Sequence, residues 1–381
     1  MLRLFILVAL LHLYIGLRIV GDLPGGLPQL AALLYLIASA TLMPLAMLSR
    51  RMSAARAERM AWLPWAGFIA MGAFSSLFVL TALRDVALLA GGTADLLLVP
   101  IYAEVERFRA LSAAAILVLA LLITAIGFVN ARRRAAVRDV DVPVTGLPAT
   151  LEGFTIVQIS DIHVGATIRG GYVSAIVDAV NSLQADLIAV TGDIVDGSVA
   201  QLATHTEPLA RLSARHGAFF ITGNHEYYSG AHAWAAEMRR LGLHVLLNEH
   251  QVVEHDGAHV VVAGITDYSA EHFDPAEKSD PAAALAGAPA NAAFTLLLAH
   301  QPRSGFAARG LGIDLQLSGH THGGQFLPWN WFVRLQQPFT AGLHRFGDFR
   351  IYVSRGTGYW GPPLRFGAPS EITRLRLRAV I

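Results

Sequence analysis

Four long apolar segments fill the first third of the chain, and they constrain its fold more than any other feature of the sequence. They run over residues 4–20, 29–48, 62–83 and 111–129. Each is close to the ~20 residues that a helix needs to cross about 30 Å of hydrocarbon. The first is short enough for a signal peptide, but no small-residue cleavage site follows it and three more apolar segments do. We therefore predict about four transmembrane helices, with residues 1–130 as a membrane anchor.

The distribution of arginine predicts the orientation of this anchor. One basic cluster fills the second loop and another follows the last apolar segment, whereas the first loop has no basic residue; the clusters are Arg50, Arg51, Arg56 and Arg59, then Arg132, Arg133, Arg134 and Arg138. Basic loops stay on the cytoplasmic side. Residues 85–110 mix apolar and charged side chains and suggest an interfacial segment, although Arg107 and Arg109 there oppose the rule slightly. We expect an integral protein of the cell (inner) membrane with its second half in the cytoplasm.

The composition of the chain excludes several classes of function for that second half. The chain is 54% hydrophobic and 15% charged, yet 14 of its 15 histidines follow residue 130. Cysteine is absent, which excludes disulfides and thiolate metal sites. Residues 131–381 carry 20 basic and 22 acidic side chains, a net charge of −2, so no nucleic-acid partner is expected. The single lysine, Lys278, follows no glycine-rich loop, which excludes a P-loop nucleotide site.

Short apolar runs alternate with helical patterns after residue 150 and predict an α/β domain over residues 151–381. Residues 131–150 contain Pro143, Gly146 and Pro148 and are predicted to be a basic linker rich in proline and glycine. The expected strands are Thr155–Ser160, Asp186–Thr191, Ala218–Thr222, Val260–Ile265, Phe294–Ala299, Asp314–Ser318, Arg350–Ser354 and Ile372–Leu377. The expected helices are Gly171–Leu183, Ala203–Arg215 and Ala231–Leu241.

Side chains that bind metals follow successive predicted strands. They are Asp161, His163, Asp193, Asn224, His225, His300, His320 and His322. Such residues converge on one crevice in open α/β sheets. Residues two apart in an extended segment point the same way, so Asp161 and His163 can reach one centre. Glycines at 192, 223, 319, 323 and 324 leave room where backbone passes close to that centre.

The types of these side chains predict the chemistry of the centre. Asp, Asn and His without Cys suit Mn, Fe, Zn or Co. Seven of these eight side chains as ligands exceed one tetrahedral ion and fit two divalent ions that share a bridge. Two such ions carry +4 and the carboxylates of Asp161 and Asp193 carry −2, which leaves a positive site for a phosphoester anion. Paired ions also generate hydroxide near neutral pH and stabilise an in-line displacement at phosphorus.

The order D-x-H, G-D, G-N-H-E, a single H and G-H-x-H, complete from Asp161 to His322, resembles the calcineurin-like metallophosphoesterase superfamily. The resemblance covers residues 151–381. Two runs, Gly319–Gln325 and Ser354–Gly361, are similar to the membrane-associated bacterial branch, with Ser370 as a small departure where proline is usual.

The resemblance implies a fold and a role for each candidate residue. The fold is a four-layer α/β/β/α sandwich. Asp193 bridges the two ions, and His225 donates a proton or a hydrogen bond to the leaving oxygen. The remaining ligands divide between the ions: Asp161, His163 and His322 hold the first with Asp193, and Asn224, His300 and His320 hold the second with Asp193. Glu226 either orients His225 or its local backbone, or is an ordinary acid at a helix start.

The leading hypothesis is a membrane-anchored hydrolase of phosphoester or pyrophosphate bonds in a lipid-linked substrate. An anchored nucleotide or cyclic-nucleotide phosphodiesterase, and a membrane sensor or transporter with a regulatory domain, stay open as alternatives. Arg303, Arg355 and Arg365 are candidate phosphate contacts, although packing roles suit them as well. The aromatic segment Phe326–Phe332, with Phe339, Tyr359 and Trp360, either forms a lipid-contacting lip of the site or covers a sheet.

Overall fold

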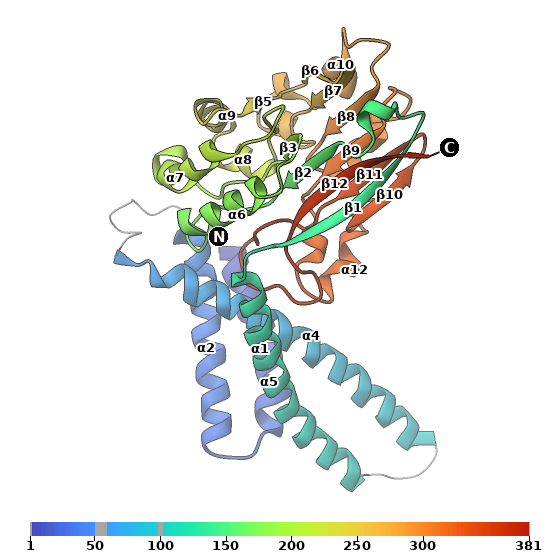
Figure 1. Cartoon of the computed structure of the whole chain (residues 1–381). Coiled ribbons are helices and arrows are strands. Elements are labelled where there is room, and N and C mark those ends of the chain that lie inside the picture. The colour runs from blue at the N-terminus through green and yellow to red at the C-terminus, as the bar shows by residue number, and fades with distance from the viewer. Residues whose placement is uncertain (1, 50–58, 98–101, 381) are drawn as a thin grey trace. The chain divides into compact units, whose positions relative to one another are not determined.

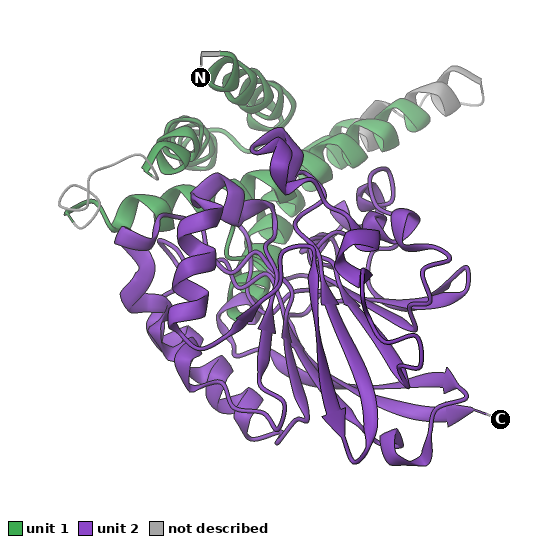
Figure 2. Cartoon of the chain, turned by 90° about the horizontal axis from the view of Figure 1, so that it is seen from above, with its two compact units in different colours: residues 1–129, 361–364 green, residues 130–360, 365–381 purple. Residues whose placement is uncertain are grey.

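The computed structural model describes residues 2–49, 59–97 and 102–380, and the chain forms two compact units. Unit 1 comprises residues 1–129 and 361–364, and unit 2 comprises residues 130–360 and 365–381 (Figure 2). Three arginines of the first basic cluster, Arg50, Arg51 and Arg56, lie outside the described residues.

Unit 1 contains the predicted helices. Within the described ranges, four helices are long and apolar enough to cross a membrane, namely α1 (Leu2–Ile19), α2 (Leu27–Leu48), α4 (Trp62–Leu97) and α5 (Tyr102–Arg132). A helix satisfies its backbone hydrogen bonds internally, as hydrocarbon demands. Helices α4 and α5 continue through most of residues 85–110, where a separate interfacial segment was expected. One charged residue there, Asp85, has partners on another helix, since it accepts hydrogen bonds from Tyr14 at 2.7 Å and Arg18 at 2.9 Å.

Unit 2 is built on two six-stranded sheets, ordered β1-β12-β2-β3-β4-β5 and β10-β11-β9-β8-β7-β6 (Figure 1). The strands of the first sheet are β1 (Ala136–Thr145), β2 (Thr155–Ile159), β3 (Leu187–Val190), β4 (Ala218–Phe220), β5 (His244–Val245) and β12 (Glu371–Val380). Those of the second are β6 (Glu249–His255), β7 (Ala258–Gly264), β8 (Phe294–Leu298), β9 (Leu315–Ser318), β10 (Gly342–Phe346) and β11 (Phe349–Val353). All eight predicted strands are present.

Strand β1 corrects the prediction of a linker. It lies at residues 136–145 and pairs in parallel with β12, from Ala136 beside Glu371 to Thr145 beside Val380. Val142 and Val144 point into the core, which gives this strand one buried face. Pro143 fits because β1 is an edge strand, where a missing N–H breaks no ladder on the open side.

Three apolar layers join the sheets and helices of unit 2. Ile156, Phe219 and Phe294 are among the residues buried between the two sheets. The outer face of the first sheet is covered by α6 (Gly170–Asn181), α7 (Val199–Thr206) and α9 (Ala231–Arg240). That of the second is covered by α10 (Pro281–Leu285) and α11 (Gly305–Ala308). The expected four-layer α/β/β/α sandwich is therefore present, and two short helices, α8 (Asn224–Ser229) and α12 (Trp329–Val333), lie in its connecting loops.

Candidate metal centre

The structure brings the eight predicted site residues together at the carboxyl ends of strands from both sheets. Loops after β2, β3 and β4 supply five of them, and loops after β8 and β9 supply three. The five are Asp161, His163, Asp193, Asn224 and His225, and the three are His300, His320 and His322. Seven are buried and His320 is half-buried. The prediction that these strand ends converge is thus correct.

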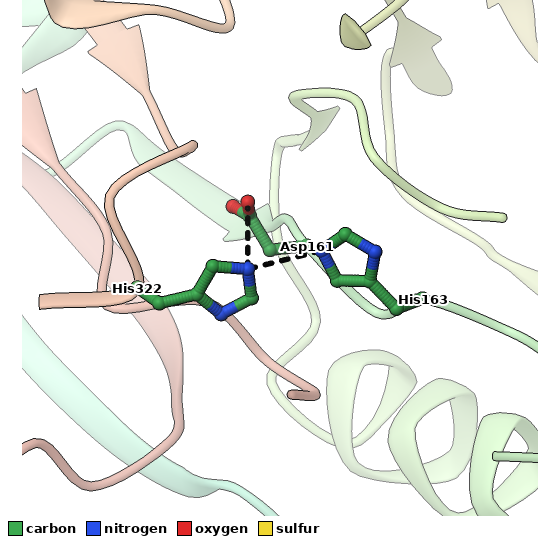
Figure 3. Close-up of side chains that lie close together, drawn as sticks. All are labelled: Asp161, His163 and His322. Carbon is green, nitrogen blue, oxygen red and sulfur yellow. Dashed lines mark hydrogen bonds and ion pairs between the residues drawn. The ribbon is translucent and has the colours of Figure 1, made fainter. Parts of the chain in front are cut away.

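Three overlapping groups of these side chains can each hold a metal ion. Within each group the ligand atoms lie within 4.8 Å of one another; the groups are Asp161, His163 and His322, then His163, Asp193 and His225, then Asp193, His300 and His320. Figure 3 shows the first, in which His322 Nε2 lies 3.0 Å from His163 Nε2 and 3.4 Å from Asp161 Oδ1. Asn224 Oδ1 joins the third at 3.0 Å from His320 Nδ1. Asp193 belongs to two groups and therefore links them.

The backbone at these positions is left-handed rather than extended, which corrects the reason given for their convergence. Of nine described non-glycine residues with positive φ, five are predicted ligands, with φ between 51° and 69°; they are Asp161, His163, Asp193, His320 and His322. A left-handed non-glycine residue carries strain of roughly 1–3 kcal/mol. Strain concentrated at one place indicates that the surrounding fold holds these side chains in position against local preference.

Glycine is required where the loops cross the centre. A Cβ on Gly223 would lie 2.2 Å from Asp193 Oδ1, and one on Gly319 would lie 2.2 Å from Asp161 Oδ2. Both distances are far below contact, so any side chain at either position would displace a carboxylate of the site. The expected close backbone approach is confirmed at these two positions.

Asp196 is a site residue that the sequence reasoning missed. Its Oδ1 lies 2.5 Å from His225 Nδ1 and 3.3 Å from His163 Nδ1. Although burial opposes its charge, His163 and His225 lower the pKa of Asp196 below its usual range. An ionised carboxylate only accepts hydrogen bonds, so both Nδ1 atoms donate and both Nε2 atoms face the centre. The only sequence signal was its place three residues after Asp193.

Glu226 organises the loops of the centre. Its carboxylate accepts hydrogen bonds from the backbone N–H groups of Gly223 at 2.7 Å, Ile194 at 2.8 Å and Asp193 at 2.9 Å. Burial raises the pKa of Glu226 to about 7. The side chain therefore ties the loop after β3 to the loop after β4, which favours the backbone-orienting role among those left open.

The three candidate phosphate contacts have partners within the protein. Arg365 is fully buried and donates to the carbonyl oxygens of His322 and Arg355, both at 2.8 Å, with Nη2 at 3.0 Å from His322 Nδ1. Burial lowers its pKa to about 10, so it stays charged at neutral pH. Arg355 pairs with Glu371 at 3.0 Å, and Arg303 lies over the Tyr268 ring. Arg365 thus supports His322 and packs the loop rather than facing solvent.

The predicted aromatic lip is only partly at the site. The exposed ring of Trp360 lies 6.0 Å from the His225 ring, and Tyr228 lies 5.1 Å from it. Tyr359, by contrast, is buried, and its hydroxyl accepts a hydrogen bond from Arg132 at 3.1 Å. The alternation along this loop sends one ring outward and the next into the core.

A sandwich with carboxylate, amide and imidazole groups gathered at its strand ends defines a class of metal-binding hydrolytic domain, and the comparisons identify the family. The model of the calcineurin-like phosphoesterase family matches residues 154–324, which include every predicted site residue. An uncharacterized metallophosphoesterase of Bacillus subtilis is 32% identical over 61% of this chain and 82% of its own length. The chain therefore belongs to the calcineurin-like phosphoesterase family, as the motifs indicated.

A second relative is itself described as a transmembrane protein. A transmembrane protein with metallophosphoesterase domain from Danio rerio is 38% identical over 68% of this chain. The chain spans 62% of that relative's length. Among solved structures, a 5'-nucleotidase precursor from Thermus thermophilus shares 16% identity over 59% of this chain and 55% of its own, with a TM-score of 0.39. With four candidate spans of its own, this chain is a membrane protein with a metallophosphoesterase domain.

Proposed function

We propose that this chain is a membrane-anchored hydrolase of phosphoester or pyrophosphate bonds that uses two divalent ions. Asp193 would bridge the ions. The first would be held in addition by Asp161, His163 and His322, and the second by Asn224, His300 and His320. The observation that carries the proposal is the place of Asp193, whose carboxylate groups with His163 of the first set and with His300 and His320 of the second. The donor set favours Mn, Fe, Zn or Co.

The state of the imidazoles supports metal binding. His300 Nε2 is buried and makes no hydrogen bond of good geometry, although it lies 3.2 Å from Asp193 Oδ2. Burial lowers the pKa of His320 to about 3, and burial with the nearby Arg365 charge lowers that of His322 well below its usual range. Neutral imidazole is the form that binds metals. Although burial opposes it, Asp193 raises the pKa of His300, so an ion would take the place of the His300 proton beside the neutral rings of His320 and His322.

The chain's own groups would share the work of phosphoester hydrolysis. Two bound ions supply a nucleophile from water near neutral pH and stabilise charge on the phosphoryl oxygens. Asp196 fixes the ring of His225 through Nδ1 and stabilises its protonated form. His225 Nε2, 4.0 Å from Asp193 Oδ2, is then placed to give a proton to the leaving oxygen. Glu226 and Arg365 keep the ligand loops in position.

A lipid-linked substrate suits the way the domain is tethered. Helix α5 ends at Arg132 and β1 begins at Ala136, so three residues connect a candidate span to the catalytic sheet. Three residues reach about 10 Å when extended. Substrates that stay in the membrane would therefore be within reach of the domain without diffusing away from it.

Purified full-length protein tests the proposal through metal analysis and a substrate panel. We expect two bound ions per chain and turnover of a detergent-dispersed lipid phosphoester or pyrophosphate, both lost after chelation and restored by Mn. Turnover of nucleotides or cyclic nucleotides with none of lipid would favour the anchored phosphodiesterase instead. Absence of both metal and turnover would leave only a regulatory role.

We also propose that unit 2 lies in the cytoplasm, from the two arginine clusters. The natural sequence lacks cysteine, so single substitutions can be labelled without background. In intact cells, an impermeant maleimide should label Gly25→Cys on the first loop and miss Glu254→Cys on β6 until the membrane is opened. The reverse labelling would place the domain outside and overturn the orientation.

A further inference from the structure

An exposed apolar surface lies directly beyond the metal-ligand loop of unit 2. It is formed by Leu327, Trp331, Phe332 and Leu335, and it is called here the α12 surface. Trp331 is 71% exposed, Leu335 is 80% exposed and Phe332 is 53% exposed. Large apolar side chains gathered this closely on a surface usually mark a site of interaction with a protein or membrane.

The exposure does not come from a loose segment, because polar contacts hold both ends of the α12 surface. At its start, Leu327 donates its N–H to the carbonyl of Phe366 at 3.0 Å. At its end, the buried side chain of Gln337 accepts from the backbone N–H of Arg303 at 3.1 Å. The segment is therefore held at both ends by hydrogen bonds to the rest of unit 2 while its large apolar side chains face outward.

The same segment is packed against the ligand loop. A Cβ on Gly324 would lie 2.3 Å from the Cα of Asn330, so the backbone of α12 (labelled in Figure 1) touches the turn that begins with His322. Thr321 also donates its hydroxyl to the carbonyl of Thr340 at 2.7 Å. A partner bound to the α12 surface would consequently be close to the predicted metal ligand His322.

The chemistry of the α12 surface and the tether of unit 2 favour a lipid bilayer as that partner. Tryptophan, phenylalanine and leucine beside a basic residue, here Arg334, are the side chains that settle at the boundary of head groups and acyl chains. The chain's own candidate spans keep unit 2 within three residues of a membrane helix. A second copy of the chain offers no comparable reason for these side-chain types.

We propose that the α12 surface inserts into the interfacial layer of the membrane that carries the chain, and that it thereby holds the metal-ligand loop at the lipid surface. Insertion of the α12 surface does not depend on catalysis. The consequence of insertion for substrate choice rests on the proposed function, because a phosphoester headgroup would then reach the site from the bilayer while its acyl chains stay in lipid.

Fluorescence in liposomes tests the insertion. Full-length Trp331→Cys, labelled with an environment-sensitive NBD group and reconstituted, should show blue-shifted emission that lipids with a shallow nitroxide quench. Val252→Cys is the matched control, because Val252 is an exposed apolar residue on β6, the last strand of the second sheet. It should show neither change. Equal quenching at both positions, or none at 331, would overturn the proposal. A blue shift at 331 without lipid quenching would mean that protein covers the surface and would also overturn it.

Kinetics test the consequence separately. Trp331→Ser combined with Leu335→Ser should raise the KM for a long-chain lipid phosphoester on the order of tenfold, with kcat, metal content and turnover of a short soluble phosphodiester nearly unchanged. Val252→Ser should change none of them. Equal loss on both substrates would show a packing role and refute the inference. If the wild-type protein showed no turnover at all, only the proposed function would be refuted, because the fluorescence experiment tests membrane insertion without any activity.

Discussion

The two units of the chain bury charge in different ways. In unit 1, Arg84 is 4% exposed and forms an ion pair with Asp22, while its other N–H groups bond to Ser112 and the carbonyl oxygens of Arg18 and Arg109. In the metal centre of unit 2, imidazole nitrogens face one another and one has no hydrogen bond. The helical unit pairs its buried charge within itself, whereas the centre gathers donor atoms in groups that could hold an ion. Buried polar groups thus stabilise the fold in unit 1, whereas in unit 2 they form the candidate metal centre.

The largest expected effect comes from removing donor atoms of the centre. Asp193→Asn and His322→Ala should each lower turnover by about four orders of magnitude or more, as loss of one member of a catalytic group does. Both variants should still insert in the membrane and fold. Metal analysis beside the rate is the decisive measurement, and an Asp193→Asn protein with two ions and full activity would contradict the shared bridge.

Changing His225 separates catalysis from metal binding. His225→Ala should keep its metal but lose about 10²–10⁴-fold in kcat, the usual size of general acid–base help. Asp196→Asn should cause a smaller loss, because the ring is still present although its partner is a weaker acceptor. An empty site in His225→Ala would instead make His225 a ligand.

Breaking the buried pair of unit 1 should affect stability rather than chemistry. Arg84→Met leaves the Asp22 carboxylate without its main partner, and such a loss destabilises by about 3–5 kcal/mol. The remaining contact from Arg109 at 3.3 Å favours the lower end of that range. Denaturant unfolding in mixed micelles measures it. Adding Asp22→Asn to Arg84→Met should recover part of the loss, and metal content should not change in either protein.

An exposed pair gives the smallest effect and completes the comparison. Arg374 and Asp139 lie 2.6 Å apart on the exposed faces of β12 and β1, with side chains 29% and 42% exposed. Arg374→Ala should lower the free energy of unfolding by less than about 1 kcal/mol, and added salt should shrink the difference. A loss as large as that of Arg84→Met would show that burial is not what separates the two pairs.

Local patterns determined much of this protein. The length of the apolar segments predicted α1, α2, α4 and α5, because the span of hydrocarbon fixes how many residues a crossing helix needs. Short apolar runs bounded by turn-forming residues predicted eight strands. The residues at the ends of those strands predicted where the centre lies, since parallel strands bring their carboxyl ends to one edge.

Only the tertiary structure decided features that depend on distant neighbours. Strand β1 looked like a linker because its partner β12 is formed by residues 371–380, at the other end of the chain. The same holds for three side chains that act by holding a site residue in place. Asp196 holds the His225 ring, Glu226 holds the Asp193 backbone, and Arg365 holds the His322 ring. The left-handed backbone at the ligand positions has no sequence signal either. Local preference opposes it, and only contacts made across the whole sandwich keep it in place.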